Sequence, residues 1–179
     1  MVKDPEAVLQ KMISSPNGPR WTESYEKLVR DEKESVKQYI EHNQAALAEK
    51  SEIPMTPSRI DLIAEVYTMG TCEINAVMEK IQTYYDQIKK VEAYFHKTHD
   101  FNIRLDEEAI DVILSDMFSS PTALGDLYNQ LTSSFEYGFK LIRDKVGQDT
   151  FVITKEALES PEAFFNKLVK KTYAEHSES

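Results

Sequence analysis

A seven-residue repeat of large apolar side chains runs through the middle of the chain and constrains the fold more than any other feature. An α-helix drifts by about 20° per heptad from such a repeat, so a strict repeat indicates a helix that supercoils around partner helices. The repeat predicts one continuous helix from about Pro57 to Thr98, about 60 Å long at 1.5 Å per residue. Its members occupy every seventh position without a polar exception: Ile60, Tyr67, Ile74, Ile81, Ile88 and Phe95.

Two uses of this long helix fit the pattern. It could pack inside an intramolecular bundle, or it could pair with a second copy of the chain as a coiled coil. In the second case Gly70 and Thr71 would mark a close helix crossing or a break. The flanks of the stripe are apolar in the first half of the helix and basic in the second half, so the first half is expected to be the more enclosed.

Helix starts are marked by a capping residue followed by proline. A side-chain oxygen at the cap accepts a free N–H of the first turn, and proline is tolerated directly after it. The device occurs at Asp4-Pro5, Thr56-Pro57, Ser120-Pro121 and Ser160-Pro161. Together with Asp106 as a further cap and Gly147 as a left-handed stop, these signals predict helices at about 5–13, 22–50, 57–98, 107–118, 121–146 and 161–174, with a loop at 14–20.

These signals leave little room for strands. Only 101–105 and 150–154 alternate as short strands do. The expected fold class is all-α: an elongated up-down helical bundle built around the long helix at about 57–98, with short capping helices at its ends. We expect one helical domain over residues 1–179, with flexible ends at about 1–3 and 175–179.

Composition indicates a soluble globular protein. Of the 179 residues, 41% are hydrophobic and 29% are charged, which is too apolar for general disorder. No run of about 18 apolar residues predicts a membrane span, and the first ten residues lack the apolar stretch of a signal peptide. The single cysteine, Cys72, excludes an internal disulfide. A cytoplasmic location is expected, and export without a cleaved signal stays open.

The acidic charge of the chain disfavours two classes of partner. Nucleic acid and anionic membranes both require a basic face, whereas the net charge here is −10. The acids concentrate between Asp100 and Glu136, where eight acidic residues and Arg104 give a net charge of −7. A solvated face explains this stretch most simply, and docking to a basic partner is the alternative.

No sequence motif predicts catalysis. The chain has only 5 glycines and no glycine-rich phosphate loop, nucleophile elbow or paired Cys-x-x-Cys motif. Cys72 has no histidine near it in sequence, so a surface or contact role is expected rather than a nucleophilic one. His96, His99 and Asp100 form the nearest approach to a metal site, but three ligands at a helix end predict no resident metal. Neither enzymatic activity nor a cofactor is expected.

Aromatic and basic residues in the second half of the long helix predict an interaction surface. Tyrosine is enriched at interfaces because it presents a large apolar body with a polar tip. Core packing of the tyrosines is the alternative, and the lysines could meet the acidic stretch of a second copy. The residues expected at this surface are Tyr84, Tyr85, Lys89, Lys90 and Tyr94.

The function expected from these features is a non-enzymatic protein–protein interaction module, such as an adaptor, chaperone, scaffold or assembly subunit. Its partner would be another protein, a second copy of the chain, or both. The alternative function is a sensor or regulatory bundle that binds a small apolar molecule between its helices.

Overall fold

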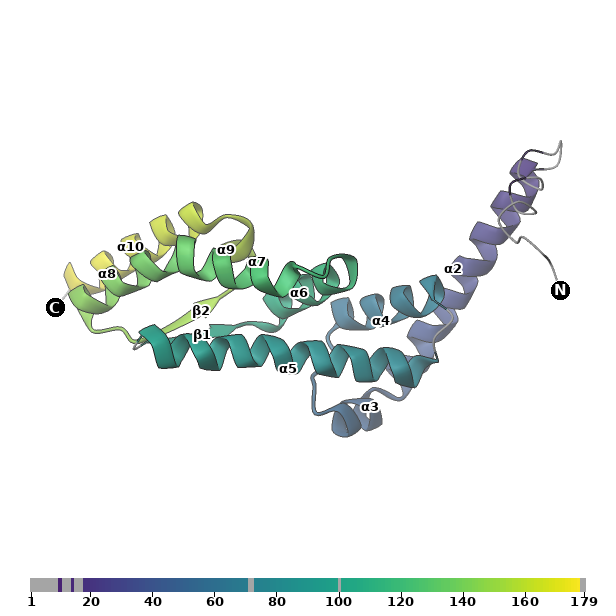
Figure 1. Ribbon diagram of the computed structural model, residues 1–179, viewed down its shortest axis with the longest axis horizontal. Helices are drawn as coiled ribbons and strands as arrows, with labels where there is room; N and C mark the ends of the chain where they lie inside the picture. Colours follow the sequence, from purple (N-terminus) through teal and green to yellow (C-terminus); the bar gives the residue numbers. More distant parts are fainter. Residues whose placement is uncertain (1–9, 11–13, 15–17, 71–72, 100, 178–179) are drawn as a thin grey trace.

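The computed structural model describes residues 10, 14, 18–70, 73–99 and 101–177, so the helix expected at 5–13 lies almost wholly outside the described residues. The described part is mostly helical, as predicted, with one two-stranded parallel sheet. Figure 1 shows an elongated arrangement: helix α2 projects at one end, and the C-terminal helices lie at the other.

The first long helix is interrupted where one helix was expected over 22–50. Helix α2 spans Gly18–His42 and helix α3 spans Gln44–Ser51. Between them Asn43 turns its side chain back and donates to the Tyr39 carbonyl at 2.8 Å. Asparagine competes with the helix in this way because its short amide reaches nearby backbone groups. The prediction was also wrong at the start, because Gly18–Arg20 belong to α2 and not to a loop.

The prediction of one continuous helix from Pro57 to Thr98 is wrong as well. Helix α4 spans Pro57–Met69 and helix α5 spans Ile74–His99, with the break at Gly70, where a weak point was suspected. The two helices form a hairpin, since the Arg59 guanidinium near the start of α4 lies 5.2 Å from the Tyr85 ring, well inside α5 (Figure 1). The apolar stripes of both helices face a shared core, and a heptad count cannot distinguish that from one helix.

The two segments that alternate as strands pair with each other across the chain. Strand β1 (Asn102–Leu105) runs parallel to strand β2 (Thr150–Ile153), with Asn102 opposite Thr150. Helix α6 (Glu107–Ser119) follows β1, and the Asp106 carboxylate caps it as predicted by accepting the Ala109 N–H at 2.7 Å.

The C-terminal helices differ from the prediction in three ways: the first begins at Ala123 and not at Pro121, a π-helical segment follows it, and a short helix before Pro161 was not predicted. Where one helix was expected over 121–146, helix α7 (Ala123–Gln130) and helix α8 (Glu136–Val146) are joined by a π-helical segment, η1 (Leu131–Phe135). Gly147 ends α8 with φ 72°, the left-handed stop that the sequence predicts. Short helix α9 (Lys155–Glu159) and helix α10 (Pro161–Ser177) complete the chain.

An aromatic core joins the sheet to α5 and α8. Phe139 of α8 stacks on Phe151 of β2 at 4.2 Å between ring centroids, and Phe101 meets both rings edge-on. Helix α5 lies along one side of the sheet in Figure 1, and α8 and α10 lie on the other. The five most central rings are each less than 2% exposed: Phe95, Phe101, Phe135, Phe139 and Phe151.

Candidate interaction surface

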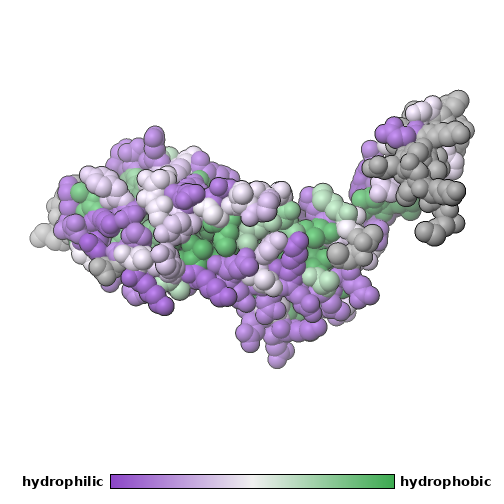
Figure 2. Space-filling model, viewed as in Figure 1, coloured by the Kyte–Doolittle hydropathy of each residue, from purple (hydrophilic) through white to green (hydrophobic). Residues whose placement is uncertain are grey.

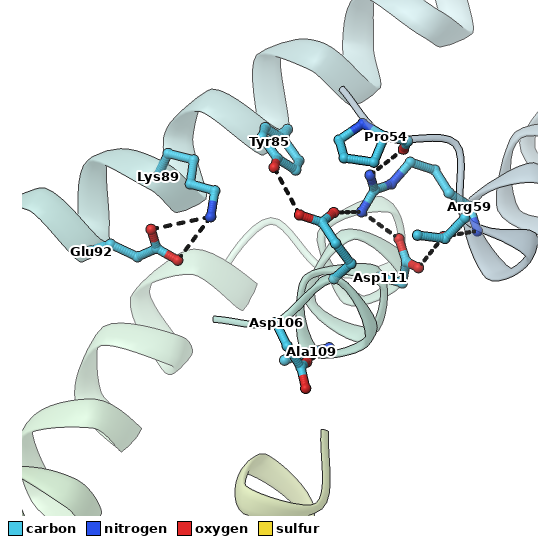
Figure 3. A network of polar contacts seen from close by, with 10 residues as sticks. Pro54, Arg59, Tyr85, Lys89, Glu92, Asp106, Ala109 and Asp111 are labelled. Atoms are coloured by element: carbon cyan, nitrogen blue, oxygen red, sulfur yellow. Dashed lines mark hydrogen bonds and ion pairs between the residues drawn. The ribbon is translucent and has the colours of Figure 1, made fainter. Parts of the chain in front are cut away.

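A buried arginine joins helices α4, α5 and α6 (Figure 3). Arg59 of α4 is fully buried, which for a charged residue requires paired partners. One terminal nitrogen donates to the Pro54 carbonyl at 2.5 Å. The other lies 2.7 Å from the Asp111 carboxylate and 2.9 Å from that of Glu107, both on α6. The cluster holds the α4–α5 hairpin against α6.

Two further groups complete this cluster. Thr56 accepts the Arg59 N–H as a helix cap and donates its hydroxyl hydrogen to Asp111. Burial raises the pKa of Asp111, while Thr56 and Arg59 oppose the shift. The Tyr85 hydroxyl donates to Glu107 at 3.1 Å. Burial, followed by the charge of Glu107 and this hydrogen bond, raises the pKa of Tyr85 to about 12. Apart from the buried Arg59 Nε, which has no hydrogen-bond partner, the charged and hydroxyl groups of the cluster are directed at one another, as in a structural ion-pair network.

The tyrosines expected to form an interaction patch on α5 have separate environments. Tyr84 is half-buried and packs edge-on against Phe118 of α6, with 5.2 Å between centroids. Tyr85 belongs to the Arg59 cluster. Tyr94 is 51% exposed and lies beside Tyr128 of α7, with 5.8 Å between ring centroids.

The structure does not bring these tyrosines together on one face. At 3.6 residues per turn, Tyr85 and Tyr94 are about half a turn apart around α5. Lys89 is held by Glu92 at 3.1 Å and lies over the Tyr85 ring, while Lys90 is exposed. Binding through these residues stays a prediction, and the geometry divides it between two sides of the helix.

The histidines considered as metal ligands also diverge. His96 is exposed, whereas the His99 ring packs on Phe95, and its Nδ1 lies 3.1 Å from the Glu136 carboxylate. Asp100 lies outside the described residues. Over the described ranges, no three histidine, cysteine, aspartate or glutamate side chains gather closely enough to hold a metal ion.

The second half of α2 is anchored on α4. Lys33 pairs with Glu65 at 3.2 Å and Lys37 pairs with Asp61, so the two helices are antiparallel. By the same spacing, Met69 at the end of α4 lies level with Val29. The part of α2 before Val29 therefore extends beyond the end of α4, as Figure 1 shows.

This projecting part of α2 carries an exposed apolar stripe. Trp21, Tyr25 and Leu28 are 56%, 66% and 67% exposed. Farther along the same line, Tyr39 is 53% exposed. These four positions lie within about 60° of one another around the helix, roughly a quarter turn from the face that packs on α4. We call them the α2 stripe. Figure 2 shows hydrophobic surface on α2 where it leaves the body.

The α2 stripe leads into a groove on the body. Val36 and Tyr39 of α2, Tyr67 of α4 and Ile74 of α5 supply its apolar lining, around a volume of about 540 Å³. Glu32 and Glu73 line the same groove, so its rim is acidic. Met69, 78% exposed, also lies at this end of α4. Stripe and groove together form a mixed apolar and acidic surface on one end of the molecule.

The sequence contains only a partial signal for the α2 stripe. The spacing of Trp21, Tyr25 and Leu28 is that of one helix face. Such spacing does not show whether a helix face is exposed or buried, so Tyr25, Leu28 and Tyr39 could equally have packed on α4. In the sequence, the exposed face of α2 differs from the face that packs on α4 because Glu32 interrupts its apolar residues.

The chain matches no protein-family model, no curated protein and no solved structure. Among the described helices, none is long and apolar enough to cross a membrane.

Proposed function

We propose that this protein is a non-enzymatic interaction module that binds another protein through the α2 stripe. The observation that carries the proposal is the stripe itself: two aromatic rings and a leucine, each more than half exposed, on a helix that extends past its own support. Large exposed apolar side chains that gather along one helix face are typical of protein interaction sites. Tryptophan and tyrosine are also the residues most often found at interface hot spots.

The shape of the stripe indicates a helical partner. An apolar line about 60° wide along one helix fits the seam of a helix–helix contact, in which side chains of one helix fill gaps between those of the other. The groove at Tyr39 and Tyr67 would take the end of such a helix. Because Glu32 and Glu73 flank the groove, basic residues on the partner helix would complement its rim.

Site-specific photo-crosslinking in the protein's own host tests the proposal. A photoreactive phenylalanine analogue replaces Tyr25 in one variant of the full chain and Tyr137 in another. Tyr137 is a suitable control because it is also an exposed tyrosine on a helix, 78% exposed, in the C-terminal half. We expect one defined protein adduct from position 25 and none from position 137.

Direct binding then follows with the identified partner. Trp21 is the only tryptophan of the chain, so its fluorescence should shift to the blue when the partner covers the stripe. Leu28→Asp should weaken binding at least tenfold, because a charge would have to be desolvated in the contact. Equal crosslinking from both positions, or unchanged affinity of Leu28→Asp, would contradict the proposal.

A further inference from the structure

The sheet has two outer edges: that of β1 lies against α5, where Leu105 donates its N–H to the Glu92 carboxylate at 2.8 Å, and that of β2 pairs with no other described strand. Asn102 of β1 donates to the Asp149 carbonyl at 2.7 Å, and Asp106 donates to the Ile153 carbonyl at 3.1 Å. In a parallel ladder alternate residues direct both backbone groups to the same side. These bonds therefore turn Phe151 and Ile153 toward β1, and Thr150 and Val152 outward.

The two residues of β2 that direct their backbone groups away from β1, Thr150 and Val152, are both exposed. Val152 is 51% exposed, although its neighbours Phe151 and Ile153 are buried in the core. The outward Thr150 carbonyl accepts a hydrogen bond from the Gln148 side chain at 2.9 Å, and an incoming strand would displace this side chain from the carbonyl. Over the described residues, no third strand pairs with this edge, and the sheet ends at β2. An unpaired edge is a template for another strand.

We propose that β2 pairs with β2 of a second copy in antiparallel fashion, with Val152 opposite Val152 of the copy on a two-fold axis. The two sheets then join into one of four strands. Each Val152 donates its N–H to the carbonyl of the other, as directly opposite residues do in a hydrogen-bonded antiparallel pair. This interface is separate from the α2 stripe and does not depend on the proposed function.

The residues around Val152 are complementary to themselves in this register. Thr150 comes opposite Thr154 of the copy, and threonine pairs across strands are favourable, as are pairs of β-branched residues. Asp149 comes near Lys155 of the copy, the exposed first residue of α9, twice by symmetry, so opposite charges meet at both ends of the contact. A shift of two residues, which keeps the same backbone groups facing the copy, would place Asp149 against Ile153 and lose these charge pairs.

The contact between two four-residue edges is small, so the association should be weak and concentration-dependent. It should also weaken with added salt, since the flanking charges are exposed. Sedimentation velocity should therefore show a monomer at low protein concentration and a dimer fraction that rises with concentration.

A charge exchange tests the register. Asp149→Lys and Lys155→Asp should each weaken dimerisation about tenfold, because each puts like charges together at both ends of the contact. The double variant Asp149→Lys/Lys155→Asp should restore dimerisation, because it restores the opposite charges. If the single variants acted only by destabilising the fold, combining them would not restore dimerisation. Circular dichroism of every variant confirms that the fold is retained.

Crosslinking gives the position directly. With Cys72 changed to Ser, Val152→Cys should form an intermolecular disulfide under mild oxidation, since directly opposite Cα atoms lie about 5.5 Å apart, within disulfide range. Arg104→Cys is the matched control, because Arg104 is exposed and pairs with Val152 in register on the inner strand. A wild-type chain that stays monomeric at all concentrations, no rescue by the double variant, or equal crosslinking of both cysteines would overturn the proposal.

Discussion

Arg59 is the residue whose replacement should cost the most stability. Its guanidinium is fully buried and paired with Asp111, which is 5% exposed at its side chain. Removing one partner of a buried ion pair leaves the other charge uncompensated and costs about 3–5 kcal/mol. We expect Arg59→Met to lower the free energy of unfolding by about that amount, as measured by urea denaturation.

The matched control removes both charges. Arg59→Met/Asp111→Leu replaces the ion pair with apolar side chains of similar volume, a change that is often neutral or stabilising. The double variant should therefore be more stable than Arg59→Met alone. If the two variants unfold at the same urea concentration, the buried charge of Asp111 is not what destabilises the single variant.

Glu136 gives the fold a dependence on acid. Its carboxylate accepts a hydrogen bond from Lys140 and lies 3.1 Å from His99, and the Lys140 bond above all lowers the pKa of Glu136 below 4.5. A carboxylate whose pKa is lower in the folded than in the unfolded state stabilises the fold when the pH is above its unfolded-state pKa. This stabilisation is lost as the pH falls through the folded-state pKa. The difference in unfolding free energy between wild type and Glu136→Gln should shrink as pH falls below 4.5. A pH-independent difference would assign the effect to packing.

Single residues were predictable where their chemistry acts locally. Asp106 as a cap and Gly147 as a stop depend only on the neighbouring backbone, and both are confirmed. The burial of Arg59 could not be predicted, because Asp111 and Glu107 lie about fifty positions away and reach it only after α4, α5 and α6 have packed. The contact between His99 and Glu136 could not be predicted either, because the two residues are distant in sequence.

At the scale of helices, Gly138 sets how closely α10 approaches α8. A Cβ atom built on Gly138 would overlap the ring of Phe165, which packs between Phe135 and Phe139. Gly138→Ala should therefore destabilise the fold by about 1–3 kcal/mol, as overpacking of a core does. The effect should appear as a lower midpoint in urea denaturation.

Gly125 is the matched control for this substitution. It lies within helix α7, and a Cβ atom there would meet nothing within 4 Å. Gly125→Ala should raise the free energy of unfolding by up to about 1 kcal/mol, because alanine loses less backbone entropy in a helix. If Gly138→Ala stabilises the fold as Gly125→Ala does, helix propensity outweighs the contact with Phe165. A smaller side chain in Gly138→Ala/Phe165→Leu should recover part of the loss.

Helices were easier to predict than their connections. The caps and apolar spacing located α6 and α10 closely, because those signals lie within each helix. The split of 57–98 into α4 and α5 was missed because Gly70 adopts an extended conformation that any residue can take, so its glycine was a weak signal. The two short strands are predicted by their alternation, but their pairing depends on the 44 residues between them, whose packing no local pattern describes.

At the scale of the whole molecule, the second half of α2 belongs to a packed body and its first half projects from that body (Figure 1). The ion pairs of Lys33 and Lys37 hold only its second half on α4. An interaction surface on such an end can engage a partner without disturbing the core. The open edge of β2 lies in the other half of the molecule, so a dimer formed there would present two copies of the α2 stripe, and two stripes would bind a repeated partner more tightly than one.

The projection of α2 predicts the size of the molecule in solution. A compact domain of 179 residues has a radius of gyration of about 16 Å. Small-angle X-ray scattering of the monomer should give a clearly larger value, because the stripe-bearing half of α2 lies beyond the body. Val152→Lys keeps the chain monomeric for the measurement, since like charges would meet at the proposed two-fold axis.

A shortened chain that begins at Val29 provides the comparison. It keeps the part of α2 that packs on α4, including Lys33 and Lys37, and should scatter as a particle with a radius of gyration nearer to 16 Å. Its thermal stability should change little, because the removed part of α2 lies beyond the end of α4. If the full chain already has the compact value, α2 folds back on the body in solution. The α2 stripe would then be covered by the chain itself, and the proposed partner contact would lose its basis.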